Sequence, residues 1–490
     1  MIECVLPRAV QLVVDDVGWR EGWRTDAEGG PYRAGIERLL GPADYRAIAE
    51  VGRRLGVRPT AAMVLCEWDT GDVCASQPSC TAAGAAWSNR HRLGPWLEES
   101  AAIFREQADH LELAMHGVGH EHWQDGRPTR AEWYSLTAGK WPWEDLLGHL
   151  RVFRAILDQH GLGPAAGHRL PVDFVPCAFH CLLDDADPQS TGALMAGAGV
   201  RYGSTPFSSL DRRSALLAAD GAVDHGVLLI DRGNSGVPWY AVDGVPSEVH
   251  GTPAAGPAAA GSICGIHWPN LLAEDPANND RAVGHWVDYL RRVDAVPGQY
   301  LADNAREAFA QWGICTFGKL RCDGTTLHLD LSGVPAAARQ ATGDLPAVVE
   351  VRGDAALRPL DASAVLWTRP LPGRSLVAVR PGADGRARFA LERGTAAVTA
   401  AAAAPTRQGT GNLLDFRRQA GCVEVDIEVY RRQRLTLPLG ARPLACEISR
   451  GGLRLEAWQA TPDGRGVEID LAGTDIQGEE GTVRLRIENA

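Results

Sequence analysis

Two short segments place metal-binding side chains where a buried strand is expected to end. Asp15 and Asp16 close the apolar run at residues 10–14, and His116 and His120 follow the apolar run at residues 111–115. One Asp and two His form a three-ligand set that leaves a divalent ion with open positions for water and substrate. The second Asp is then a neighbouring candidate base. This combination predicts hydrolysis and not a structural or storage metal.

The two histidines are separated by Gly-Val-Gly, which decides how they can meet. Histidines four residues apart share a face of a helix, but the two glycines make a helix unfavourable here. A glycine-rich loop can curl instead and bring both imidazoles to one point. The pair alone is a weak indication of a metal. The indication becomes stronger because His267 follows a later predicted strand. In the sequence, Arg169 lies between the histidine pair and His267, two residues before Pro171.

The elements that would position these residues alternate between strands and helices over the first 315 residues. Such alternation predicts a parallel sheet with crossover helices, and over this length a barrel-like β/α domain. In such a barrel, catalytic groups follow the carboxyl ends of the strands. The expected strands are 11–14, 60–65, 111–115, 200–204, 226–230 and 262–266, and the expected helices are 44–55, 95–108, 143–159, 279–292 and 301–312.

After Gly318 the pattern changes to short alternating or β-branched strands separated by Gly, Pro and Asp. It predicts an antiparallel β-sandwich, so the expected domains are residues 1–315 and 316–490. The second domain has no cluster of His, Cys or Trp that would mark a catalytic or lectin site. Positioning of substrate, closure of the active site and formation of a homo-oligomer all remain open as its role.

Charge and hydropathy exclude some classes of partner. The net charge of −12 argues against a nucleic-acid partner, which would normally require a basic face. No window approaches about 18 uninterrupted apolar residues, so no membrane span is expected. Residues 1–8 lack a basic region followed by an apolar stretch, so no signal peptide is expected. The sequence therefore predicts a cytoplasmic protein.

The 11 cysteines show irregular spacings without a C-x-x-C pair, so they do not indicate a structural zinc site. Cys66, Cys74 and Cys80 form one cluster, and Cys177 and Cys181 are four residues apart. The favoured interpretation is reduced thiols, several of them buried as small hydrophobes. Disulfides in the 66–80 loop are the alternative, and they would require an oxidising compartment.

Taken together and in order, the motifs make residues 5–315 resemble the polysaccharide deacetylase family, carbohydrate esterase family four. That family has an Asp-Asp motif after its first strand, a His-Ser/Thr-x-x-His motif, an Arg motif followed by Pro, and a late motif ending in His. Its fold is a distorted β/α barrel, in agreement with the pattern above. The corresponding segments here are Val14-Asp15-Asp16, His116-Gly117-Val118-Gly119-His120, His168-Arg169-Leu170-Pro171 and Ile263-Cys264-Gly265-Ile266-His267.

The resemblance implies a role for each motif residue. Asp16, His116 and His120 would hold the metal, most simply zinc, with cobalt or manganese also suited to such a site. Asp15 would be the general base that deprotonates water. Arg169 would pair with Asp15, and His267 would be the general acid for the leaving amine. Gly117 departs from the family by replacing Ser or Thr, and the Asp that tunes His267 is left open between Asp231 and Asp243.

The expected activity is removal of an acetyl or similar small acyl group from an N-acylated amino sugar or saccharide. Trp19, Trp123 and Trp268 follow predicted strand ends and can stack on sugar rings, or else pack in the core. Glu67 and Asp69 follow the second strand and either bind substrate or belong to a solvated loop. A non-sugar amide substrate on the same fold, and a non-catalytic carbohydrate-binding protein, are the alternative functions.

Overall fold

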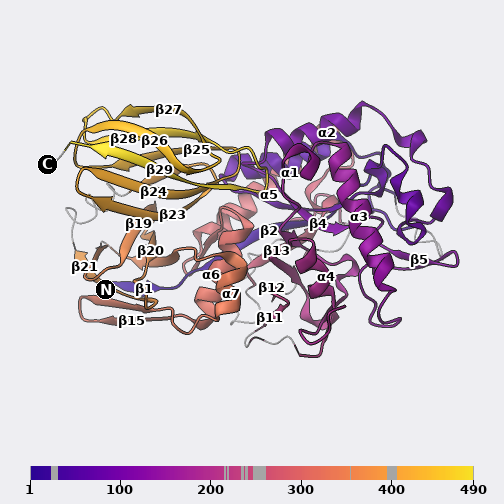
Figure 1. Cartoon of the computed structure of the whole chain (residues 1–490), viewed down its shortest axis with the longest axis horizontal. Helices are drawn as coiled ribbons and strands as arrows, with labels where there is room; N and C mark the ends of the chain where they lie inside the picture. The colour runs from indigo at the N-terminus through magenta and orange to yellow at the C-terminus, as the bar shows by residue number, and fades with distance from the viewer. Residues whose placement is uncertain are drawn as a thin grey trace. The chain divides into compact units, whose positions relative to one another are not determined.

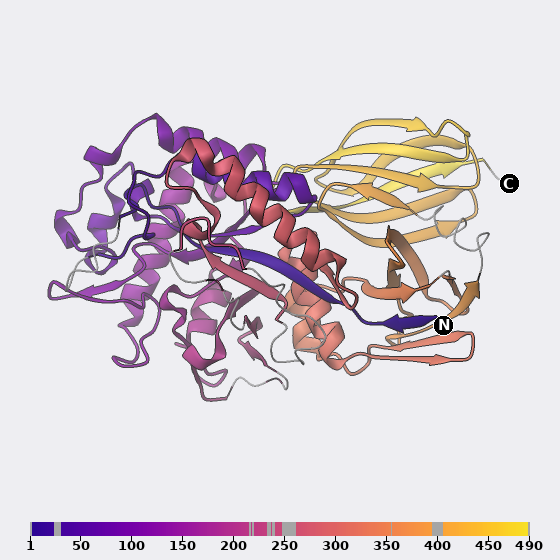
Figure 2. The same ribbon diagram turned by 180° about the vertical axis from the view of Figure 1, so that it is seen from behind.

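The chain forms two compact units (Figures 1 and 2), one spanning Val10–Val293 and the other built from the residues up to Ala9 and from Asp294 onward. These limits differ from the expected boundary between residues 315 and 316, because the first strand and helix α6 (Ala305–Phe317) belong to the β-rich unit. The computed structural model describes residues 2–23, 31–214, 217, 220–232, 237, 241–246, 261–353, 355–393 and 405–488.

The first unit is a mixed α/β structure around a curled sheet. Seven parallel strands run in the order β12-β9-β7-β4-β3-β2-β13, and β11 adds antiparallel to β12. Among the described residues no ladder joins β13 to β11 or β12, so a closed (β/α) barrel is not confirmed. The strands of this sheet that belong to the first unit are β2 (Arg8–Val17), β3 (Thr60–Val64), β4 (Glu112–Gly117), β7 (Asp173–Phe174), β9 (Tyr202–Thr205), β11 (Gly221–Asp224), β12 (Val227–Asp231) and β13 (Ile263–His267).

Helices separate the first five strands of this sheet, from β2 to β9, along the chain, and every residue of β3 and β4 is buried, as expected for a parallel sheet covered on both faces. Figure 2 shows β13 beside β2, where Ile266 pairs with Val14. The helices are α1 (Pro42–Leu55), α2 (Pro95–Glu106), α3 (Trp143–Gln159), α4 (Thr191–Gly197) and α5 (Asn279–Ala295); the shorter strands are β5 (His122–Gln124), β6 (Arg127–Thr129), β8 (Cys181–Leu183) and β10 (Leu210–Arg212).

Helix α1 illustrates how local sequence sets these boundaries. The Asp44 carboxylate accepts a hydrogen bond of 2.8 Å from the N–H of Gly41 at the start of the helix. Gly56 ends the helix with a φ of 70°, a left-handed conformation that glycine adopts without steric cost. The intervening apolar residues face the interior, and Ile48 and Val51 are fully buried.

Over its described residues the second unit contains four antiparallel sheets of four strands each, so the single β-sandwich expected for residues 316–490 is not confirmed. The orders are β1-β17-β20-β19, β15-β16-β21-β18, β22-β25-β28-β27 and β23-β24-β29-β26. The first two sheets share a core that includes Leu329, Val349 and Phe389. The last two share another with Val425, Leu435 and Ile469.

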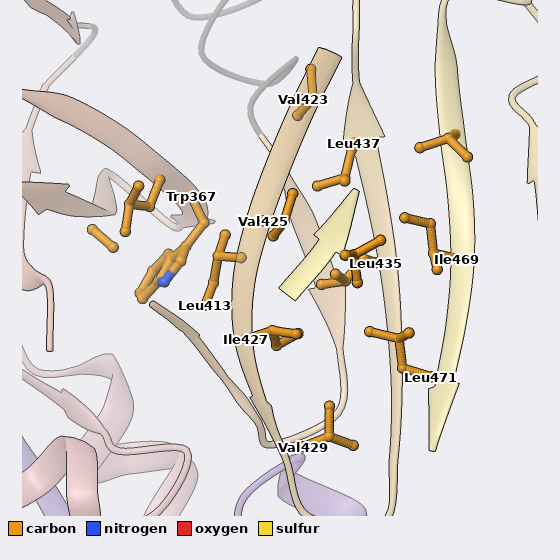
Figure 3. Close-up of a cluster of buried hydrophobic side chains, with 14 of the residues drawn as sticks. Trp367, Leu413, Val423, Val425, Ile427, Val429, Leu435, Leu437, Ile469 and Leu471 are labelled. Atoms are coloured by element: carbon orange, nitrogen blue, oxygen red, sulfur yellow. The ribbon is translucent and has the colours of Figure 1, made fainter. Parts of the chain in front are cut away.

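The larger of these cores, drawn in Figure 3, receives alternate side chains from the first part of β24. Val423, Val425 and Ile427 of β24 are fully buried, whereas the residues between them are only half-buried. Trp367 of β19 joins the same cluster. Burial of each such side chain stabilises the fold by about 1.5–3 kcal/mol relative to exposure.

The N-terminal strand β1 (Glu3–Val5) is part of the second unit, since it pairs antiparallel with β17 so that Glu3 lies opposite Arg352. The Gln311 side chain of α6 donates 2.9 Å hydrogen bonds to the carbonyls of both Pro7 and Val348, which ties the same segment down. The remaining bounds of this unit are β14 (Gln299–Leu301), β15 (Lys319–Asp323), β16 (Thr326–Asp330), α7 (Ala336–Thr342), β17 (Ala347–Arg352), β18 (Ala355–Pro359), β19 (Ala364–Leu371), β20 (Arg374–Arg380), β21 (Arg386–Arg393), β22 (Thr406–Gln408), β23 (Asn412–Gln419), β24 (Cys422–Val429), β25 (Arg432–Pro438), β26 (Pro443–Gly451), β27 (Arg454–Ala460), β28 (Gly466–Ala472) and β29 (Glu479–Ile487).

All 11 cysteines lie within the described residues and are free thiols, so the prediction of reduced cysteines is confirmed and the alternative of disulfides in the 66–80 loop is wrong. No helix in the described ranges combines the length and the apolar character needed to span a bilayer.

Candidate metal centre

Irregular strand ends aim the predicted metal ligands. The register between β2 and β3 shifts between Val14 and Val17, across Asp15 and Asp16. On β4 the register shifts between Met115 and Gly117, across His116. Such bulges redirect side chains at strand ends. Two consecutive carboxylates of one strand therefore both face the site, although regular strand residues would alternate between faces.

Asp16, His116 and His120 converge as expected. The Oδ1 atom of Asp16 lies 3.3 Å from Nε2 of His116 and 3.4 Å from Nε2 of His120, and all three side chains are buried. The Nδ1–H of His116 donates a 2.6 Å hydrogen bond to the carbonyl of Val175. Because that bond fixes the ring orientation, it directs Nε2 toward Asp16, as in many histidine ligands of metals.

The protonation states of Asp16 and His120 suit a cation. Burial alone would raise the pKa of Asp16, but the hydrogen bond with His116 and the nearby His120 and His267 lower it overall. Burial lowers the pKa of His120 well below its usual value. For His116 burial acts in the same direction, but Asp16 outweighs it and raises the pKa. An ionised carboxylate and a neutral imidazole are the forms that bind a metal.

His267 connects this cluster to a cavity. Its Nε2 lies 3.7 Å from Oδ2 of Asp16, and its backbone N–H donates a 2.9 Å hydrogen bond to Oδ1 of Asn270. The cavity has a volume of about 570 Å³, and His267 lines it together with Arg232, Phe179 and Asn270. A ligand in this cavity would therefore meet His267 directly.

The guanidinium beside Asp15 is that of Arg232, and the prediction that Arg169 would pair with Asp15 is corrected. Nη1 of Arg232 lies 2.9 Å from Oδ2 of Asp15 in a buried ion pair. Arg169 is exposed and precedes β7, which puts it at the amino end of the sheet, opposite the site. Arg232 directly follows β12, so it stands at the carboxyl edge. A Cβ at Gly265 on β13 would lie 1.7 Å from Nη2 of Arg232, so a larger residue there would displace the guanidinium.

A carboxylate that sequence reasoning missed clamps the loop between the two histidines. Glu132 accepts hydrogen bonds from the backbone N–H groups of Val118 at 2.8 Å, Gly119 at 3.2 Å and His120 at 2.9 Å. Its other side contacts Nδ1 of His149 at 2.9 Å. Both side chains are fully buried. A completely satisfied carboxylate therefore holds the metal-ligand loop in place.

This clamp explains why position 117 is glycine. A Cβ there would lie 2.2 Å from Oε2 of Glu132 and 2.7 Å from Sγ of Cys177, so Ser or Thr does not fit. Donor atoms of His116, His120 and Cys177 lie within 4.8 Å of one another, and all three side chains are buried. The site thus contains a buried His/His/Cys group able to hold a metal ion, which the sequence pattern did not identify.

Tyr32 is a further contact to the ligands without a signal in the sequence. Its hydroxyl donates a 2.6 Å hydrogen bond to Oδ2 of Asp16, and its ring stacks on His120 with centroids 4.2 Å apart. Its backbone N–H donates a 2.8 Å hydrogen bond to Oε1 of Glu121. Tyr32 lies in an irregular segment, where no periodicity could have pointed to it.

The two acidic residues predicted to bind substrate are engaged by the protein. Glu67 is fully buried and forms ion pairs with Arg33 at 3.1 Å and Arg92 at 3.2 Å. Asp69 is also fully buried and accepts a 2.9 Å hydrogen bond from the N–H of Cys74. Their contacts organise loops of the protein. The structure therefore matches neither of the two expectations, a substrate ligand or a solvated loop residue.

The three tryptophans predicted as sugar platforms are buried as well. Trp268 is fully buried and packs on Tyr45 with ring centroids 4.8 Å apart. Arg33 covers the ring of Trp19 at 4.7 Å, and Trp123 of β5 is 8% exposed. Their large apolar surfaces are used in packing, which was the alternative left open for them.

The two candidates for tuning His267 occupy different settings. Asp231 lines the same cavity as His267 and accepts a 3.2 Å hydrogen bond from the N–H of Phe207. The carboxylate of Asp243 contacts Nδ1 of His285 at 2.9 Å. Asp231 is therefore the candidate that the cavity favours.

Searches against protein-family models, curated protein sequences and solved structures found no significant match.

Proposed function

We propose that the protein is a metal-dependent amide hydrolase that removes an acetyl or similar small acyl group from an N-acylated amino sugar or saccharide. The proposal includes a distorted β/α barrel of the polysaccharide deacetylase type for the first unit. One observation carries it: a candidate base, three candidate ligands and a candidate acid gather at the carboxyl edge of one sheet, around the Asp16 carboxylate.

The donor chemistry supports a divalent cation. Asp16, His116 and His120 would hold it, with zinc as the first expectation and cobalt or manganese as further candidates. The short distances from Oδ1 of Asp16 to both Nε2 atoms put the donors in one small buried volume. When bound, the ion would polarise the amide carbonyl and make water more acidic.

Asp15 is proposed as the base. Its carboxylate is 1% exposed and faces Arg232 at 2.9 Å. A carboxylate at this position can accept a proton from a neighbouring water. The same ion pair restricts the rotation of Asp15 and thus orients the accepting oxygen.

His267 is proposed as the acid. It lies near Oδ2 of Asp16, whereas the two ligand histidines lie near Oδ1 of the same carboxylate. It also borders the cavity. A histidine side chain can donate the proton that an amine leaving group requires. Asn270 fixes the backbone of His267.

The cavity supports a small substrate. Its volume of about 570 Å³ lies within the range of about 300–1,000 Å³ typical of small-molecule sites. The lining combines the aromatic rings of Phe179 and Phe207 with the polar side chains of Ser208 and Asn270. Aromatic faces beside hydrogen-bonding groups suit a pyranose ring and its substituents.

The test combines metal analysis with acetate release from N-acetylated amino sugars, from monosaccharide to short oligomer. Arg232→Ala should lower kcat/KM by about 10²-fold or more, since base catalysis contributes about 10²–10⁴-fold. Its matched control, Arg169→Ala, should stay close to wild type. His267→Ala should lower kcat while the bound metal is retained. A metal-free wild-type protein, or turnover indifferent to Arg232 and His267, would overturn the proposal.

A further inference from the structure

The segment after β7 brings a thiol to the candidate metal centre. β7 pairs in parallel with β4, Phe174 lying opposite Met115, so the residues that follow both strands meet at the same edge of the sheet. Cys177 follows β7 as His116 and Gly117 end β4. Its Sγ and donor atoms of His116 and His120 lie within 4.8 Å of one another.

We propose that Cys177 is a ligand of the metal bound by His116 and His120, so that the centre is selective for thiophilic ions. This inference rests on the metal site of the proposed function but not on the hydrolytic reaction. Cys177 is buried, and so are both histidines. An ion near the centre of this group would be within reach of all three donors after small shifts.

The local backbone is shaped around this sulfur. Gly117 leaves room for it, because a Cβ at that position would lie 2.7 Å from Sγ. The two residues after Cys177, Ala178 and Phe179, have φ values of 53° and 64°. A left-handed conformation is uncommon for residues other than glycine, and here a tight turn follows the cysteine directly.

The Cys177 thiol makes only weak hydrogen bonds in this structure. Sγ lies 3.2 Å from the carbonyl of His116 and 3.9 Å from Oε2 of Glu132, and the His116 carbonyl already accepts a 2.6 Å hydrogen bond from Nε1–H of Trp133. On coordination the S–H bond would break, the proton would leave to solvent and the sulfur lone pair would bind the cation. The His116 carbonyl would keep Trp133 as its donor, so no buried acceptor would be left unpaired.

A thiolate ligand changes which ions the centre prefers. Cysteine sulfur favours Zn²⁺ and Co²⁺, whereas Mn²⁺ and Mg²⁺ favour oxygen ligands. The inference therefore excludes manganese as a preferred ion, although an Asp/His/His set alone would accept it. The substrate class and the reaction do not enter this expectation.

The experiment uses the full chain loaded with Co²⁺ and reads the near-ultraviolet absorption that reports a cobalt–thiolate bond. Wild type should show this band at one equivalent of Co²⁺. Cys177→Ser should bind Co²⁺ without the band, and Cys181→Ser, a buried cysteine of β8 outside the His/His/Cys group, should keep it. Stoichiometric Co²⁺ without the band in wild type, or a band that survives Cys177→Ser, would overturn the inference while leaving the metal site intact.

A second measurement covers a serine variant that fails to fold. In competition between Zn²⁺ and Mn²⁺, Cys177→Ala should reduce the preference for Zn²⁺ by about tenfold or more, because it removes the only sulfur donor of the group. An unchanged preference in a folded Cys177→Ala protein would overturn the inference. Failure of wild type to bind either ion would overturn both this inference and the proposed metal centre, whereas metal binding without acetate release would count only against the reaction.

Discussion

Two buried carboxylates, Glu428 in the β-rich unit and Asp15 in the β/α unit, differ in how many hydrogen bonds they accept. Glu428 of β24 accepts hydrogen bonds from Nδ2 of Asn412 at 2.7 Å and the Tyr430 hydroxyl at 2.9 Å, and it pairs with Arg306 at 2.9 Å. Asp15 has Arg232 at 2.9 Å, but neither of its oxygens receives a well-aligned hydrogen bond from any described residue.

The difference separates a structural charge from a chemical one. A buried ionised group is costly unless it is paired and hydrogen-bonded. The Glu428 network meets that requirement, so its contribution is to the stability of the β-rich unit. Both oxygens of Asp15 can still accept hydrogen bonds, as the oxygens of a base must. Glu132, in the same unit as Asp15, is a buried carboxylate whose oxygens accept hydrogen bonds from three backbone N–H groups. Its role is to hold the 118–120 loop.

The substitution Asp15→Asn is expected to have the largest effect and tests the difference between Asp15 and Glu428 most directly. We expect acetate release to fall by about 10²–10⁴-fold, because the amide cannot accept the proton that the carboxylate would. The free energy of unfolding should fall by less than in Glu428→Gln, since Arg232 lines the cavity, where water can solvate it. Steady-state kinetics and urea unfolding measure the two quantities. An active or grossly unstable Asp15→Asn protein would remove the distinction.

Glu428→Gln should produce the opposite pattern. Removing the charge takes away the buried partner of Arg306, which then keeps the half-exposed Glu480 at 2.8 Å, so the loss should be at most about 3–5 kcal/mol, the cost of leaving a buried charge unpaired. Glu424→Gln on the same strand is the matched control, because Glu424 is partly exposed and pairs with Arg484, which should contribute at most about 1 kcal/mol. Equal losses of stability in both variants, measured by urea unfolding, would contradict the structural role of Glu428.

Glu132→Gln tests the satisfied carboxylate next to the site. Its amide would point N–H groups at backbone donors of the 118–120 loop, so the ligand His120 would be held less firmly. We expect the affinity for Zn²⁺ to fall by about 10–100-fold, the usual cost of losing an outer support of a metal ligand. Competition with a chelator measures it. Glu98→Gln on the exposed face of α2 should leave the affinity unchanged, and an equal effect there would refute the clamp.

The smallest expected effect is a pH dependence of the Glu428 contribution. Burial alone would raise the pKa of Glu428, but Arg306 and the hydrogen bonds from Asn412 and Tyr430 lower it overall. A lowered pKa stabilises the fold above the unfolded-state value of about 4.3 and loses that contribution as the pH falls toward the folded-state value. The difference in unfolding free energy between wild type and Glu428→Gln should therefore narrow below about pH 4. A constant difference from pH 7 to pH 3 would contradict it.

Much of the site could be predicted because parallel strands end at one edge of a sheet. Asp15, Asp16, His116 and His267 each follow or end a buried apolar run, and the structure brings them together. The prediction that Arg169 pairs with Asp15 was wrong because β7 has only two residues. So short a strand leaves no pattern in the sequence from which its ends could be located. Arg232 satisfies the strand-end rule after β12 and could have been found by it.

The supporting residues could not be predicted, because they depend on contacts between distant irregular segments. Tyr32 reaches Asp16 from a loop, and Glu132 reaches the 118–120 loop from a segment without regular structure. Helix α3 was predicted at Trp143–Gln159 and found there, since its apolar spacing is local information. The division of the β-rich unit into four sheets rests on long-range pairings that alternation along a strand does not specify.

The pairing of β1 with β17 has a consequence for how the protein is made. Glu3 and Arg352 are separated by 349 positions (352 − 3) yet lie side by side in one sheet. At a synthesis rate of roughly 5–20 residues per second, the ribosome needs about 20–70 s to deliver the second strand after the first. Among the strands of its sheet, the first to leave the ribosome therefore waits longest for a neighbour, and the whole β/α unit is completed while that strand is still unpaired.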